Sequence, residues 1–122
     1  MPNSEQPQFK IAGVADAIFK LVLFAPILES FIMAAVLAVL LRLLPPAFAI
    51  IVSSAAWAVL HALAVPAWGL VIWWPFLVFS TIYTVWRTRG FLVGVGMAAT
   101  VHALNNLVPA LAIAAAPMLA TG

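Results

Sequence analysis

Glu29, His61, His102 and Asn106 are polar residues that stand inside long apolar runs of this sequence. A carboxylate, two imidazoles and a carboxamide form a plausible hydrolytic set, in which the Glu29 carboxylate serves as a general base that activates water. His61 could orient that water or the carboxyl group. His102 and Asn106, one helical turn apart, could donate hydrogen bonds to the oxyanion of a peptide carbonyl. These residue types therefore permit peptide-bond hydrolysis if the fold brings them together.

Glu29, His61 and His102 also form a second kind of set. Two histidines and one glutamate can hold a catalytic zinc ion with one position left for water. The residue types do not choose between zinc and metal-free chemistry, so zinc remains a candidate cofactor and the metal stays open. The sequence contains no cysteine, no G-x-S-x-G, no H-E-x-x-H and no Gly-rich phosphate loop, which removes support from the enzyme classes that depend on them.

The composition places this set of residues in a membrane. Of 122 residues, 67% are hydrophobic and only 7% are charged, with a mean hydropathy of +1.24. A water-exposed surface cannot be built from so few polar side chains. Five basic and three acidic residues are also too sparse for a nucleic-acid-binding surface. We therefore expect the lipid bilayer as the main partner of the chain and no nucleic acid.

The elements that must position the polar residues are apolar helices. We expect an all-α fold, a polytopic membrane bundle of four transmembrane helices preceded by a short amphipathic helix over residues 9–20 that lies flat on the membrane. Residues 1–20 then form a polar tail and an interfacial helix, and residues 21–122 form the transmembrane core. Each span has roughly the 20 apolar residues that cross a bilayer. The expected spans are 21–44, 47–65, 68–86 and 90–112 or slightly beyond, the last ending before Pro117.

The depths of the polar residues agree. Let side A be the membrane side that carries the N-terminus. At a rise of about 1.5 Å per residue, Glu29 lies roughly 12 Å below side A, counted from Lys20. His102 reaches a similar depth in a core of about 30 Å, and His61 lies roughly 6 Å below side A. Residues from three helices thus fall in the side A half of the membrane.

The helical faces agree as well. His102 and Asn106 share a stripe of small residues with Gly90, Gly94, Ala98 and Ala110, and such stripes pack closely against neighbouring helices. A single histidine or asparagine in a membrane often only joins two helices. A buried glutamate is costly without a task, however, and four such groups in one layer favour a single site.

Three segments carry these residues: APILESFIMAA over 25–35, WAVLH over 57–61 and HALNN over 102–106. Together they resemble the CPBP family of intramembrane proteases (CAAX proteases and bacteriocin-processing enzymes, also called Abi). That family is marked by E-E-x-x-x-R, F-x-x-x-H and H-x-x-x-N on successive helices. The resemblance covers about residues 20–115. It implies that Glu29 is the catalytic glutamate, that His61 and His102 are the two histidines, and that Asn106 is the asparagine. It also implies a peptide or lipidated-protein substrate, cleaved near its C-terminus or at a leader.

Three positions depart from the family motifs. Ser30 stands in place of the second glutamate, Ala34 in place of the arginine, and Trp57 in place of the phenylalanine. Ser30 and Ala34 remove a charged pair that would orient the neighbouring carboxylate. An alternative hypothesis is therefore a catalytically inactive homologue that acts as a scaffold or accessory subunit, with a second copy or other membrane subunits as partners. A third reading is a proton-relay element of a transporter.

The expected location is a multi-pass position in the bacterial inner (cytoplasmic) membrane. The side opposite to side A carries Arg42, Arg87 and Arg89, whereas side A carries Lys10 and Lys20. The positive-inside rule favours the arginine side as cytoplasmic. The family resemblance favours side A, because its proteases open their site to the cytosol. The orientation therefore stays open.

Overall fold

The computed structural model describes residues 7–120, with side chains for residues 13–116 and 119–120. The part of the polar tail that falls on residues 1–6 lies outside this range. Within the described residues there are helices and no strands, so the predicted all-α fold is confirmed. The elements are α1 (Pro7–Ile18), the π-helix η2 (Phe19–Phe24), α2 (Ala25–Leu43), α3 (Pro46–Ala64), α4 (Pro66–Trp86), the 3-10 turn η3 (Arg87–Arg89) and α5 (Phe91–Leu119).

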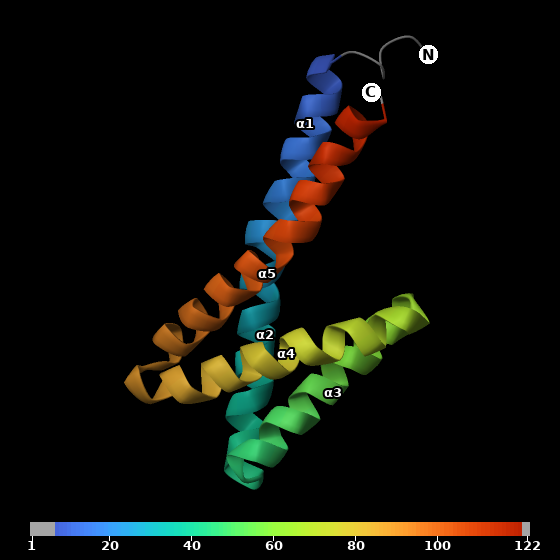
Figure 1. Cartoon of the computed structure of the whole chain (residues 1–122). Helices are drawn as coiled ribbons and strands as arrows, with labels where there is room; N and C mark the ends of the chain where they lie inside the picture. Colours follow the sequence, from blue (N-terminus) through green and yellow to red (C-terminus); the bar gives the residue numbers. More distant parts are fainter. Residues whose placement is uncertain (1–6, 121–122) are drawn as a thin grey trace.

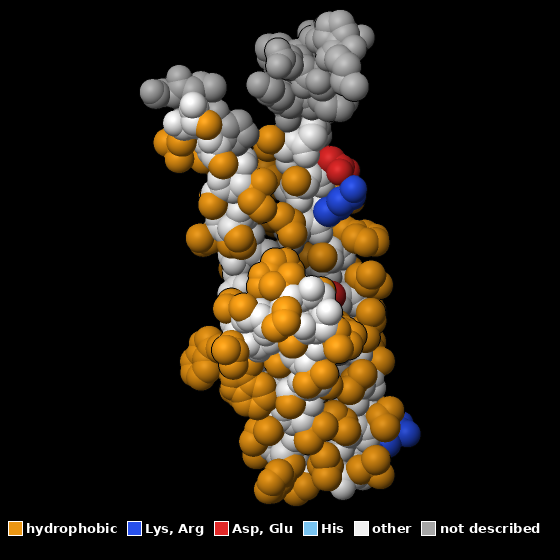
Figure 2. Space-filling view, turned by 90° about the vertical axis from the view of Figure 1, so that its right-hand side faces the viewer, with side chains coloured by type: hydrophobic (Ala, Val, Ile, Leu, Met, Phe, Trp, Pro, Cys, Tyr) orange, Lys and Arg blue, Asp and Glu red, His pale blue; other side chains and the backbone are white. Residues whose placement is uncertain are grey.

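Four helical stretches are long and apolar enough to cross a membrane, as predicted. They are Gly13–Leu43, Pro46–Ala64, Pro66–Arg89 and Phe91–Ala116. Hydrophobic side chains cover most of the surface in Figure 2, and charged side chains are few on that face. A surface of this kind is stable against lipid and unstable against water. The chain is therefore a membrane protein.

Proline and glycine set the breaks between the spans. Pro45 has an extended backbone, and Pro46 begins α3, where its missing N–H costs nothing. Val65 is extended before Pro66, the first residue of α4, because a residue that precedes proline avoids the helical region. Gly90 has a φ of 136° between η3 and α5, a conformation that residues with a Cβ rarely adopt.

Two stretches differ from the expected boundaries. The N-terminal helix α1 continues through η2 into α2 without a break (Figure 1), because no glycine or proline interrupts residues 14–25 and Pro26 falls in the first turn of α2. The last span does not stop before Pro117 but runs to Leu119. A proline so close to the end removes only one hydrogen bond from the last turns, which the helix tolerates.

Figure 1 shows how the helices cross. The long helix formed by α1, η2 and α2 runs the height of the molecule, and the C-terminal half of α5 lies beside its upper part, so that both ends of the described chain lie at the same end of the molecule. Helices α3 and α4 form a tight hairpin. A Cβ at Gly69 of α4 would lie 2.8 Å from Ala62 Cβ and 2.9 Å from the Ala58 carbonyl oxygen of α3, so only glycine allows this approach.

The core lies where α2, α3, α4 and α5 meet. Its centre includes one small polar link, because the Ser80 hydroxyl lies 3.4 Å from both Ser53 Oγ and Met33 Sδ. Several other hydroxyls bond their own helices, as hydroxyls in membrane helices usually do; Ser54, for example, donates to the Ile50 carbonyl. The buried hydrophobic residues around this link are Met33, Ala34, Leu37, Ala49, Trp57, Phe76, Phe79, Tyr83, Val95 and Ala98.

Candidate functional site

Glu29 of α2 lies between two histidines that come from different helices. Its Oε2 is 3.3 Å from Nε2 of His102 on α5, and its Oε1 is 3.9 Å from Nε2 of His61 on α3. The two carboxylate oxygens therefore face different imidazoles. Residues that are 32 and 41 positions apart in the sequence (29 to 61, and 61 to 102) meet here.

The His102 ring is held in an aromatic slot formed by α4. It stacks on Phe79 with ring centroids 4.3 Å apart, and Phe76 meets it edge-on at 5.3 Å. His102 is almost fully buried, and no described residue bonds its Nδ1. The proton of a neutral His102 ring therefore belongs on Nε2, where it can point at the carboxylate, while the lone pair remains on Nδ1. The slot fixes the ring, and the ring holds one oxygen of Glu29.

His61 is held by its own helix. Its Nδ1 lies 2.9 Å from the Trp57 carbonyl oxygen one turn earlier, and because a carbonyl only accepts, Nδ1 carries the proton. The Nε2 lone pair of a neutral ring then faces Glu29 Oε1. Trp57 in turn stacks on Phe76 at 4.6 Å, so the same α4 phenylalanine supports both histidines. The 3.9 Å between Oε1 and Nε2 is too long for a direct hydrogen bond. Both atoms are acceptors, so a water molecule at this position could donate one hydrogen to each of them.

The cluster is closed on one side and open on the other. The side chain of His102 is 4% exposed, whereas those of His61 and Glu29 are 19% and 25% exposed. The closed side, with His102, is the core, and the open side carries the exposed parts of Glu29 and His61. A group that approaches from outside the bundle can therefore reach Glu29 and His61 without displacing the core.

Asn106 is placed differently from the other three residues. It lies on α5 one turn beyond His102, and its Nδ2 donates to the Leu21 carbonyl oxygen at 2.9 Å. In η2 the hydrogen bonds run from residue i to i−5, as Ala25 N–H to the Lys20 carbonyl shows. The donor expected for Leu21 is then residue 26, which is a proline without an N–H. Asn106 supplies the donor that Pro26 lacks.

Ser30 and Ala34, which differ from the motifs that the sequence resembles, are fully buried in the core. They share the face of α2 that carries Met33 and Leu37. No described residue bonds the Ser30 hydroxyl. Side chains of glutamate and arginine would need space that the packed helices occupy here. The small residues are therefore matched to the close approach of the helices around α2.

The arrangement of Glu29, His61 and His102 does not form a zinc site. Among the residues that the structure describes, no set of three or more His, Cys, Asp or Glu side chains is placed to hold a metal ion. Glu29 is also engaged by His102 through the oxygen that would have to turn toward a shared ion. We therefore derive no chemical step through a metal.

Sequence reasoning missed the groups that support this site. Phe76 and Phe79 are three residues apart and share a helical face, but in an apolar run nothing separates them from ordinary lipid-facing residues. The link from Asn106 to Leu21 had one signal, Pro26 near the start of the first span, which implies a carbonyl without its usual donor.

The chain was compared with models of protein families, with curated proteins and with solved structures, and none of them matches.

Proposed function

We propose that the chain is a CPBP-like intramembrane protease core that hydrolyses peptide bonds with water. One observation carries the proposal: in an apolar bundle, the Glu29 carboxylate of one helix lies 3.3 Å from the His102 imidazole and 3.9 Å from the His61 imidazole, which come from two other helices. Burying an ionisable cluster at this depth is costly and is read by default as functional. The three residues are also those that the family motifs single out.

In the proposed reaction, a water molecule lies in the gap between Glu29 Oε1 and His61 Nε2. It donates one hydrogen to each atom, and its oxygen attacks the carbonyl carbon of the substrate. The proton released in this attack passes to Glu29, and a tetrahedral oxyanion forms. When the C–N bond breaks, Glu29 returns the proton to the leaving amine. His102 holds Oε2 so that Oε1 keeps its direction throughout.

The oxyanion requires a donor, and the candidate donors are already engaged in part. His102 Nε2 faces Glu29, and Asn106 Nδ2 is bonded to Leu21. One of the two N–H groups of the Asn106 amide remains for a substrate oxygen. In this proposal Asn106 first positions η2 against α5, and it reaches the oxyanion only through that second N–H.

The expected substrate is a peptide or lipidated protein that enters from the membrane through the open side of the cluster. Glu29 and His61 are reached from that side, and large apolar side chains such as Leu28 and Leu60 are exposed on the same two helices. An acyl or prenyl chain is compatible with such a surface. The proposed location is the bacterial inner membrane.

Cleavage of an internally quenched peptide with an isoprenylated C-terminal motif tests the proposal. The purified chain in detergent should cleave it, and Glu29→Gln should lower turnover by about a hundredfold or more, since a general base typically contributes that much. Asp16→Asn is the matched control, because Asp16 is an exposed carboxylate that pairs with Lys20. Equal turnover in wild type and Glu29→Gln would exclude the protease proposal.

A second candidate function is a catalytically inactive scaffold or accessory subunit of a larger membrane complex. Specific observations favour it: Ser30 and Ala34 are packed into the core without the charged pair of the family, and the Asn106 donor is engaged. The quarter-exposed Glu29 would then accept a donor from a partner helix. This candidate predicts stoichiometric co-purification with other membrane subunits, and loss of that association in Glu29→Leu. Purification of an active chain without partners would contradict it.

A further inference from the structure

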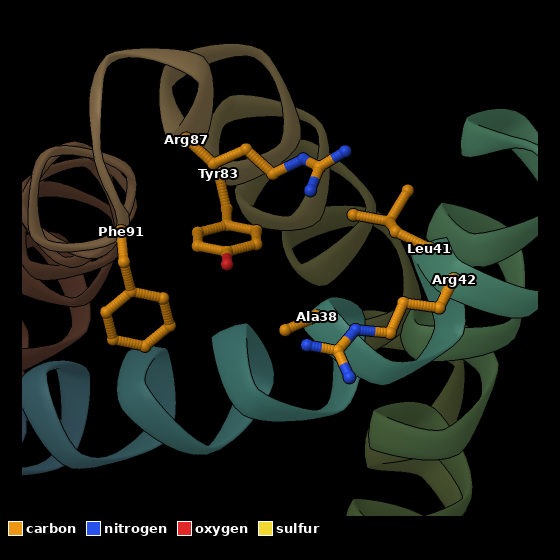
Figure 3. Close-up of a pocket in the computed structure, with 6 residues that line it drawn as sticks. All are labelled: Ala38, Leu41, Arg42, Tyr83, Arg87 and Phe91. Carbon is orange, nitrogen blue, oxygen red and sulfur yellow. The ribbon is translucent and has the colours of Figure 1, made fainter.

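A second polar site lies at the opposite end of the bundle from the termini. A pocket of about 250 Å³ opens where the end of α2, the end of α4 and the start of α5 meet. Figure 3 shows the guanidinium groups of Arg42 and Arg87 at opposite edges of this pocket, with the Tyr83 hydroxyl pointing into it. Its remaining lining residues are apolar: Ala38, Leu41 and Phe91.

The two arginines bring like charges to one pocket. The acidic residues that the structure describes, Asp16 and Glu29, pair with Lys20 and with the histidines instead. Two guanidinium groups that line the same pocket repel each other unless an anion lies between them. This arrangement is complementary to a ligand that offers several negatively charged oxygens at once.

A phosphate group meets that requirement best. Guanidinium is a planar fork of donors that binds phosphate oxygens in pairs. A tetrahedral phosphate can present different oxygens to two forks and one more to a phenolic hydroxyl. Hydrogen bonds of this kind are roughly twice as strong as neutral ones.

The position of the pocket matches the depth of lipid phosphates. Arg42 is 13 residues beyond Glu29 on α2, which places it about 20 Å further along the helix, at the end of the span. The neighbouring Phe91 is exposed on the apolar side of the pocket, where it can contact an acyl chain or glycerol backbone. Basic pockets between transmembrane helices at this level bind anionic headgroups.

We propose that Arg42, Arg87 and Tyr83 form a binding site for a phosphate group with net negative charge, such as the headgroup of an anionic phospholipid. The site is separate from the Glu29 cluster and does not depend on the proposed protease activity. Its occupation ties the end of α2 to the turn between α4 and α5, and so fixes the spacing of the helices that carry Glu29 and His102.

Thermal unfolding of the full chain in zwitterionic detergent tests the site. Titration with phosphatidylglycerol should raise the unfolding temperature, and the same amount of phosphatidylcholine should not. Arg42→Gln and Arg87→Gln should each weaken the apparent affinity for phosphatidylglycerol about tenfold or more, the usual effect of losing a charged hydrogen-bond partner. The affinity of Arg42→Lys should lie between those of the wild type and Arg42→Gln, because lysine keeps the positive charge but lacks the paired donors of a guanidinium group.

Arg89→Gln is the matched control. Arg89 follows the same helix end but lies over the Trp86 ring, with its guanidinium carbon 4.9 Å from the ring centroid, and it does not line the pocket. Its replacement should leave the affinity for phosphatidylglycerol unchanged. An equal loss in Arg89→Gln, or equal shifts with both lipids, would overturn the proposal in favour of general charge attraction. If inorganic phosphate alone gives the full shift, the site binds a soluble phosphate and not a headgroup.

Discussion

The two polar sites of this protein handle charge in opposite ways. At the first site, the Glu29 carboxylate faces the imidazoles of His61 and His102, which can carry the opposite charge. The His102 ring is in turn stacked on Phe79. Around Arg42 and Arg87, two like charges line one pocket, and the described acidic residues lie elsewhere. The first site lies at the edge of the packed core, with His102 buried and Glu29 and His61 partly exposed. The second lies at the end of the spans, where the surroundings can supply an anion.

This difference indicates what each site needs from outside. In the Glu29 cluster each ring is held by its neighbours, so the geometry exists before any ligand arrives, which is the condition for efficient catalysis or for a specific helix contact. In the arginine pocket the charges are balanced only by a bound anion. Replacement of a buried group at the first site should therefore lower the free energy of unfolding under all conditions. Replacement of an arginine at the second site should lower it only when the anion is present.

His102→Ala should have the largest effect on stability. The imidazole fills the slot between Phe76 and Phe79, and removal of a buried ring of this size typically costs about 3 kcal/mol of the free energy of unfolding. His102→Phe should lose clearly less, because the stacking partner remains. Reversible unfolding in mixed micelles measures both. Equal losses would mean that the contact with Glu29, not the aromatic packing, holds α5 in place.

Gly94→Ala should come next, because Gly94 of α5 lies close to Tyr83 and Arg87, which line the arginine pocket. A Cβ there would lie 2.9 Å from Tyr83 Cδ2 and 3.1 Å from Arg87 Cα, and overpacking of this kind costs about 1–3 kcal/mol. Gly96→Ala is the control, since its Cβ would meet nothing within 4 Å. The two unfolding free energies can be compared in the same micelles. Equal stability of both variants would show that the α4 to α5 contact beside the arginine pocket is loosely packed.

Asn106→Ala should cost about 1 kcal/mol, because it leaves the Leu21 carbonyl without a donor. The cost should fall when Pro26 is also replaced by alanine, since residue 26 then has an N–H for that carbonyl. A double-mutant cycle on unfolding measures this coupling. Additive effects of the two changes would contradict the assignment of Asn106 as the substitute donor. Both N–H groups of its amide could then serve the substrate oxyanion.

Arg42→Gln should have the smallest effect when no anionic lipid is present. Arg42 is exposed, and surface changes of this kind usually alter stability by less than about 0.5 kcal/mol. The change can even be slightly stabilising, because it removes a like charge from the pocket. Unfolding in a zwitterionic detergent without added lipid measures it. A large loss would show that Arg42 holds the fold through contacts within the chain.

Much of the fold was accessible from the sequence because the membrane imposes simple rules. The four spans follow from apolar length, and Pro46, Pro66 and Gly90 mark their starts. The layer that contains Glu29, His61 and His102 follows from a fixed rise per residue. These rules apply to one helix at a time. They give the position of a residue along the helix axis and the side of the helix on which it lies.

The remaining features depend on how helices meet, which such rules do not contain. The slot formed by Phe76 and Phe79, the engagement of Asn106 by Leu21, and the arginine pocket each need the relative rotation of two helices. The rise per residue therefore places Asn106 near His102 along α5, whereas its hydrogen bond to the Leu21 carbonyl depends on how α5 and η2 pack together. Arg42 and Arg87 were visible only as basic residues on one side of the membrane.

The π-helix η2 makes the chain tolerant to a change in length at one place. A π-turn corresponds to one extra residue in an otherwise regular α-helix. Deletion of one residue within Phe19–Phe24 can therefore restore an α-helix while α1 and the rest of α2 keep their orientations. The same deletion between Pro26 and Glu29 would turn the carboxylate by about 100° around the helix axis, away from His102. The short widened segment thus separates a region of the chain that can lose a residue from one that cannot.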